Sequence, residues 1–147
     1  MDLGIAERTS METSDNVRVI QEIYAAMGRG DVAEILARMK EDARWDFNVG
    51  PSDVPWHTPA TGPEEIQKFL GGFIDNVTLT AFEPRRFIAS GDDVVVDVHL
   101  AYTIKRTGKL VDLEQLHWWS LGDRRVARLR HFEDTAQVIS AWSESSG

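Results

Sequence analysis

The chain has 147 residues, 42% of them hydrophobic and 27% charged, which suits one domain with a sizeable buried core. It has no cysteine, and this excludes disulfides, a thiolate nucleophile and sulfur-ligated metals. Its formal net charge of −8 argues against a nucleic-acid partner, which needs a basic binding surface.

Targeting signals are not evident. No apolar run approaches the roughly 20 residues that cross a bilayer. The first fifteen residues are unlike a signal peptide because they contain Asp2, Glu7, Arg8, Glu12 and Asp15. We therefore expect a cytoplasmic protein with no membrane partner.

The N-terminal part predicts two helices. Residues 1–14 show no sustained period and are expected to form a flexible tail. Ser14 or Asp15 can cap a first helix, which Gly28 and Gly30 would end. Asp31 can cap a second helix, because a glutamate follows three places later in a variant of the capping box. The apolar stripes of the two helices are Val19, Ile20, Ile23, Tyr24 and Met27, and Val32, Ile35, Leu36 and Met39.

A short strand and a third helix follow. Residues 44–49 predict a strand with Trp45 and Phe47 on one face. Proline and glycine make 50–62 a loop, and Pro63 suits the first turn of a helix.

The second half alternates apolar and polar residues, which is typical of strands. Strands are predicted at 78–89, 93–104, 110–121 and 124–133. Three helices before a four-stranded meander indicate one α+β domain over residues 15–140, followed by a C-terminal tail at 141–147.

This order of elements resembles the SnoaL-like polyketide cyclases, the ketosteroid isomerases and the limonene epoxide hydrolases, which share the nuclear-transport-factor-2-like (NTF2-like) fold. Four segments carry the resemblance: Tyr24 to Asp31, Glu41 to Trp45, Pro55 to His57 with Gly62, and the hairpin from His117 to Asp134. The resemblance implies a cone-shaped α+β barrel, with three N-terminal helices packed on a curved, mainly antiparallel sheet around a ligand pocket.

Side chains alternate between the two faces of a strand, and this alternation places a cluster of polar residues in the pocket. Gln115, His117 and Trp119 share the more apolar face of the third strand of the meander, and His131 lies on the matching face of the fourth. A turn centred on Asp123 would place His117 opposite Leu129. The two histidines would then be diagonal neighbours, about 7 Å apart.

The orientation of Asp97 depends on the preceding turn. If that turn is centred on Thr107, Asp97 lies opposite His117 and can fix the tautomer of a general base. If the turn shifts by one residue, the valines line the pocket and Asp97 faces outward. The pattern of valines favours the second register.

The resemblance also implies roles for single residues. His117 stands where ketosteroid isomerases carry an oxyanion-stabilising aspartic acid, and Phe47 stands near their general-base aspartate. The epoxide hydrolases match at Asp97, but Val95 replaces their partner arginine. His131 corresponds to the acid/base aspartate of the cyclases and epoxide hydrolases.

We therefore predict cofactor-independent acid/base chemistry: cyclisation, isomerisation or hydration of a mostly apolar carbonyl or epoxide compound. His131 would be the acid/base and His117 the donor to a developing oxyanion, with Asp97 as a further catalytic candidate. The substrate-binding candidates are Trp45, Phe47, Tyr24, Gln115, Trp119, Phe69 and His57. No metal site is expected, because the four histidines lack metal-ligand spacing.

The alternative is a non-catalytic ligand-binding or dimeric interaction module of the same fold. Large apolar residues on the outer sheet face usually mark an interface, and we expect a homodimer there. The candidate residues for this interface are Leu116, Trp118, Val126 and Phe132.

Overall fold

The computed structural model describes residues 3–143, with side chains described from residue 13. The elements follow one another as α1 (Leu3–Arg29), α2 (Val32–Ala37), β1 (Met39–Phe47), the short 3-10 helix η1 (Pro55–His57), β2 (Ala60–Thr61), α3 (Gly62–Asn76), β3 (Val77–Ser90), β4 (Asp93–Ile104), β5 (Leu110–Gly122), β6 (Arg125–Phe132) and α4 (Thr135–Ser143).

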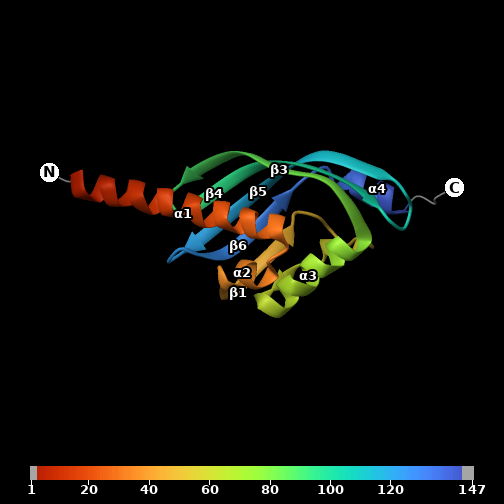
Figure 1. Ribbon diagram of the computed structural model, residues 1–147, viewed down its shortest axis with the longest axis horizontal. Coiled ribbons are helices and arrows are strands. Elements are labelled where there is room, and N and C mark those ends of the chain that lie inside the picture. The colour runs from red at the N-terminus through yellow and green to blue at the C-terminus, as the bar shows by residue number, and fades with distance from the viewer. Residues whose placement is uncertain (1–2, 144–147) are drawn as a thin grey trace.

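The strands form one sheet in the order β2-β1-β6-β5-β4-β3. Strands β1 and β6 are parallel, and all other neighbours are antiparallel. The first three helices lie along one face of this curved sheet, and α4 lies near the C-terminal end of the molecule (Figure 1). The α+β class and the mainly antiparallel sheet are therefore confirmed, although β2 and β3 are free edges and the sheet does not close into a barrel.

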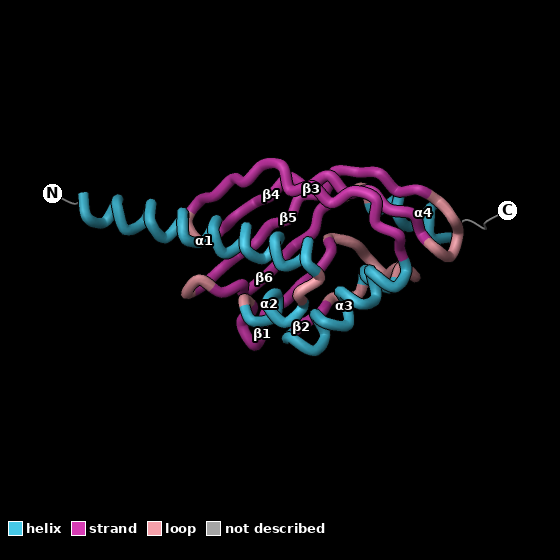
Figure 2. The backbone as a smooth tube through the Cα atoms, viewed as in Figure 1, coloured by secondary structure: helices cyan, strands magenta, loops and turns pink. Residues whose placement is uncertain are grey.

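The N-terminal helix is longer than predicted. It begins at Leu3 rather than at Ser14 or Asp15, so most of the segment that we expected to be a tail is helical. Figure 2 shows this first part of α1 extending away from the sheet. Residues 3–13 contain good helix formers and no proline, so a capping residue at 14 does not have to start the helix.

The second helix and the first strand divide the chain differently from the prediction. Asp31 caps α2 as expected, its carboxylate accepting from the backbone N–H of Glu34 at 3.1 Å. The helix ends at Ala37, however, and Met39 begins β1 instead of completing a helical stripe. Pairing of β1 with β6 supplies backbone hydrogen bonds that a longer helix could not make.

A fourth helix was not predicted. Helix α4 buries Val138 and Ala141, and its segment 141–143 belongs to the expected C-terminal tail. The tail residues 144–147 lie outside the described part of the chain. Nine residues give too short an apolar stripe to be recognised by period alone.

The hairpin of β5 and β6 brings the two histidines closer together than predicted. His117 pairs directly with His131, two places from the predicted partner Leu129. The turn has two residues with positive φ, Asp123 and Arg124, and a bulge follows Ser120. The bulge adds one residue, Ala127, to β6 and turns Val126 into the core, so Val126 is not part of the outer patch.

Among the described residues, no helix is long and apolar enough to span a membrane.

Candidate functional site

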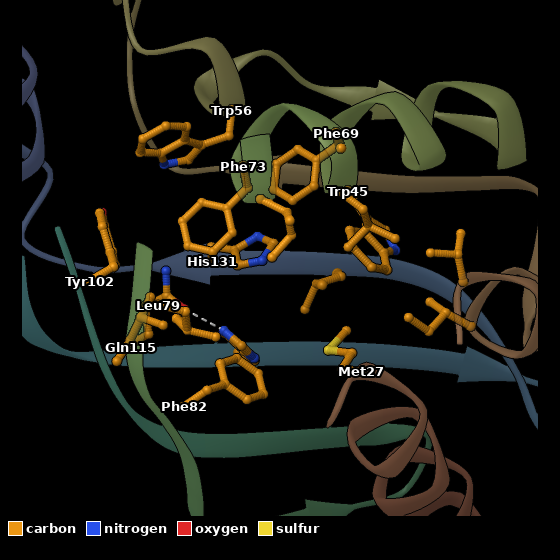
Figure 3. Close-up of a pocket in the computed structure, with 18 of the residues that line it drawn as sticks. Met27, Trp45, Trp56, Phe69, Phe73, Leu79, Phe82, Tyr102, Gln115 and His131 are labelled. Atoms are coloured by element: carbon orange, nitrogen blue, oxygen red, sulfur yellow. Dashed lines mark hydrogen bonds between the residues drawn. The ribbon is translucent and has the colours of Figure 1, made fainter. Parts of the chain in front are cut away.

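A cavity of about 530 Å³ lies between α3, the α1–α2 corner and the inner face of the sheet. Its size is that of a small-molecule site. Nearly all its walls are apolar, and many are aromatic (Figure 3). The predicted residues that line it are Trp45, Phe47, Phe69, Gln115, His117 and His131.

His131 presents one free ring nitrogen. Its Nδ1 lies 3.1 Å from the backbone carbonyl oxygen of Asp46. A carbonyl only accepts, so Nδ1 carries the proton in the neutral ring and Nε2 keeps its lone pair. Nε2 makes no hydrogen bond with any residue that the structure describes. This nitrogen can therefore take up a proton from a bound molecule.

The ring of His131 is held by aromatic neighbours. Phe47 stacks on it with centroids 4.2 Å apart, and Phe69 stacks at 5.7 Å. Burial lowers its pKa to about 4, although the hydrogen bond to the Asp46 carbonyl opposes this shift. His131 is consequently neutral at pH 7.

His117 has both ring nitrogens bonded within the protein. Nδ1 lies 2.6 Å from the hydroxyl of Tyr24, which itself accepts from the indole N–H of Trp119 at 3.0 Å. Nε2 lies 2.5 Å from the side-chain oxygen of Gln115. Burial, with His131 nearby, lowers the pKa of His117 well below its usual value. A neutral ring with both nitrogens engaged has no free N–H for a ligand oxyanion, which argues against the predicted donor role.

The chain of hydrogen bonds ends on Glu133, which the sequence reasoning missed. The amide N–H of Gln115 donates to the carboxylate at 2.6 Å, while the second carboxylate oxygen is enclosed without a partner. Burial raises the pKa of Glu133 to about 7. Glu133 follows the last residue of β6, and its contact with Gln115 depends on the β5–β6 register, so no local pattern identifies it.

Three predicted residues lie outside the cavity wall. Tyr24 and Trp119 lie behind His117 and orient it. His57 is buried under the loop, where Nδ1 contacts the hydroxyl of Ser52 at 2.9 Å and the ring contacts Phe47. Burial lowers the pKa of His57 to about 4.

Asp97 is not part of the site. It pairs with Leu116, and Val96 is the residue opposite His117, so the strand has the second of the two registers considered. A displacement of one residue exchanges the faces of a strand, and Asp97 therefore faces the outer side. The Asp97–His117 pair is not formed.

Two further cavity residues were missed as ligand contacts. Tyr102 and Trp56 both line the cavity but are not among the predicted substrate-binding residues. A residue with a polar tip in a row of aliphatic side chains was the available signal for Tyr102.

The described residues include no group of three or more His, Cys, Asp or Glu side chains that could hold a metal ion. His99, on the outer face, contacts Glu83 through one ring nitrogen and Asp112 through the other.

The curved sheet, the covering helices and the aromatic cavity together define an α+β domain with an internal cavity, which solved proteins of the NTF2-like fold resemble. The family model described as SnoaL-like domain matches residues 20–129. The chain belongs to this SnoaL-like family.

Solved structures agree with this assignment. An NTF2-like protein from Burkholderia xenovorans is 26% identical, over 89% of this chain and 98% of its own, with a TM-score of 0.81. TerC, co-crystallised with polyporic acid, is 26% identical over 88% of this chain and 99% of its own, with a TM-score of 0.75. A proposed polyketide cyclase from Xanthomonas campestris shares the fold at 20% identity, covering 89% of this chain and 98% of its own, with a TM-score of 0.72. The comparison with curated proteins gives no match.

Proposed function

We propose that the protein catalyses cofactor-independent proton transfer on a flat, mostly apolar carbonyl compound, with His131 as the acid/base. One observation carries the proposal: Nε2 of His131 is the unprotonated nitrogen of a buried ring that lines the cavity, and no described residue bonds to it. The co-crystal of TerC with polyporic acid supports a ligand of this general kind.

The low pKa of His131 limits the substrates from which it can remove a proton. A base with a pKa of about 4 is weaker than a free imidazole. It can remove a proton efficiently only where conjugation stabilises the resulting anion. Once protonated, the same ring is a strong acid that can return the proton to an enolate carbon or oxygen. Isomerisation and cyclisation of conjugated carbonyl compounds both consist of such steps.

Hydrogen–deuterium exchange tests this role without knowledge of the natural substrate. The probe is 2-tetralone in D₂O, and NMR measures the loss of its α-protons. We expect catalysed exchange by the native protein, and a rate lowered by about 10²–10⁴-fold in His131→Asn, as for loss of a general base. Catalysis should also fall as the pH drops through about 4, where Nε2 becomes protonated.

The matched control is His99→Asn, because His99 lies on the outer sheet face away from the cavity. Equal exchange by the native protein and His131→Asn would contradict the proposal. Binding of polyporic acid without exchange of any probe would instead indicate the alternative function, a non-catalytic small-ligand binder.

A further inference from the structure

Two aromatic side chains with polar tips meet at one part of the cavity wall. Trp56 of η1 is 2% exposed and Tyr102 of β4 is 1% exposed, and both line the cavity. Their ring centroids are 6.1 Å apart with the planes at 83°. Phe73 of α3 contacts each ring edge-to-face at 5.2 Å. The three rings therefore hold one another in fixed orientations.

The polar atoms of this pair are free. Neither the indole N–H of Trp56 nor the hydroxyl of Tyr102 makes a hydrogen bond with a residue that the structure describes. Unlike the enclosed indole nitrogen of Trp45, these two atoms retain accessible surface. Figure 3 shows the indole nitrogen of Trp56 on the ring edge turned toward the cavity. Buried indole and phenol groups usually have a partner, so this pair is available to a bound molecule.

The chemistry of the pair selects an uncharged oxygen acceptor. An indole N–H only donates. Burial, and secondarily the nearby Glu133, raise the pKa of Tyr102, so its hydroxyl stays protonated and can donate. The cavity wall contains no lysine or arginine, and a carboxylate or phosphate would lack a counter-charge there. A carbonyl oxygen accepts hydrogen bonds from both donors and carries no charge.

The pair lies within reach of a molecule held at His131. Tyr102 contacts Phe73, and His131 contacts Phe69 at 5.7 Å. The two phenylalanines are one turn apart on α3, which corresponds to about 6 Å along the axis. One flat molecule of two or three rings can span this distance.

We propose that the N–H of Trp56 and the O–H of Tyr102 together bind the carbonyl oxygen of the substrate, which is an uncharged, flat ketone, enone or quinone of two or three rings. The inference rests on the proposed function in taking this cavity as the reaction site. His131 Nε2 accepts the proton from a carbon conjugated with the carbonyl, such as the γ-carbon of an enone. The electron pair of the broken C–H bond forms a C=C bond of the dienolate, the existing C=C bond shifts by one position, and the carbonyl π pair moves to the oxygen held by the two donors. Return of the proton to carbon restores the neutral histidine.

The test compares 2-acetylnaphthalene with 2-isopropenylnaphthalene, in which a =CH₂ group replaces the carbonyl oxygen. Calorimetry or fluorescence titration gives the dissociation constant of each compound, and their ratio removes the common apolar contribution. We expect the preference for the ketone to fall about three- to tenfold in Tyr102→Phe and in Trp56→Phe, the usual effect of losing one hydrogen bond.

Two controls separate donor loss from packing changes. Trp142→Phe removes an indole that contacts Trp56 at 5.8 Å but does not line the cavity, and it should keep the native ratio. Tyr24→Phe removes a hydroxyl bonded to His117, so it should lower the melting temperature. Tyr102→Phe should not lower it, because no hydrogen bond within the described protein is lost.

The outcomes distinguish the two proposals. An unchanged ketone preference in both donor variants overturns the donor pair, while the exchange assay with His131→Asn still decides the proposed function. Failure of both naphthalenes to bind the native protein also overturns the inference, because the cavity then rejects the proposed class. A lost preference in the variants, without proton exchange in the native protein, supports the donor pair and counts against catalysis.

Discussion

The carboxyl group of Glu133 ends a chain of hydrogen bonds that runs from Trp119 through Tyr24, His117 and Gln115. Its second oxygen is enclosed and has no hydrogen-bond partner within the described part of the chain. Burial therefore disfavours the ionised form, and the pKa rises to about 7. Because the folded-state pKa exceeds the unfolded value, the carboxyl stabilises the fold below about pH 4.5, and that contribution is lost as the pH rises through about 7.

Glu133→Gln should accordingly raise the melting temperature more at pH 8 than at pH 5. The amide keeps an acceptor for Gln115 and removes the buried negative charge. Thermal unfolding at the two pH values measures the difference. An equal effect at both pH values would show that the carboxyl is not the titrating group.

The buried histidines should make the free energy of unfolding change with pH in the opposite direction, at lower pH. Burial lowers the pKa of His57, His117 and His131, so the folded state keeps them neutral while the unfolded chain takes up protons below about pH 6.5. The contributions of His57 and His131 are complete above that pH and are lost as the pH falls toward 4, and His117 acts in the same direction. Urea unfolding between pH 7 and 5 should show declining stability, with a smaller decline in His57→Asn.

At the scale of elements, helix α3 contains a glycine that packing does not require. A Cβ on Gly72 would meet nothing within 4 Å, and glycine in a helix interior costs up to about 1 kcal/mol relative to alanine. Gly72→Ala should therefore raise the melting temperature by about 2–4 °C. Gly62, the first residue of α3, is the control: its φ is +84° and a Cβ would lie 3.3 Å from the carbonyl oxygen of Glu41. Gly62→Ala should destabilise, and the same sign for both variants would contradict this account.

The element boundaries show what periodicity can predict. Strands β3 to β6 were placed within two residues, because alternation runs the length of each. Helix α4 and the start of β1 were missed, because their short apolar stripes mean little without the sheet they pack on. The sheet face on which each side chain lies was predicted better than the pairing between strands. Gln115, His117 and His131 point inward as predicted, but the bulge after Ser120 changes the residues that they pair with.

For the whole molecule, we propose a homodimer formed through the outer sheet face. Leu116 is 46% exposed there, and Arg130 lies over the ring of Trp118 at 4.2 Å. An exposed apolar patch of this kind is more stable against a second protein surface than in water.

Light scattering tests the dimer. The native chain should have twice the mass of one copy, and Leu116→Glu should be monomeric because it places a charge in the patch. Ile74→Glu is the matched control, because Ile74 is 55% exposed on α3, away from the outer sheet face. A native monomer, or a dimer unaffected by Leu116→Glu, would contradict the interface.

The amino-acid sequence by itself determined the fold class, the strand segments and the inward-facing histidines, because these depend on local periodicity and on which residue types are buried. Tertiary structure alone decided how the polar groups are used. Pairing of His117 with Tyr24 and Gln115 leaves His131 as the cavity histidine with a nitrogen that no described residue contacts. Tyr24 lies 93 residues from His117, and Asp46 lies 85 residues from His131. Trp56 and Tyr102 likewise come from a short loop helix and a strand, which tertiary packing with Phe73 places side by side. Whether a polar group finds a hydrogen-bond partner depends on distances between such remote segments, and no local sequence pattern encodes those distances.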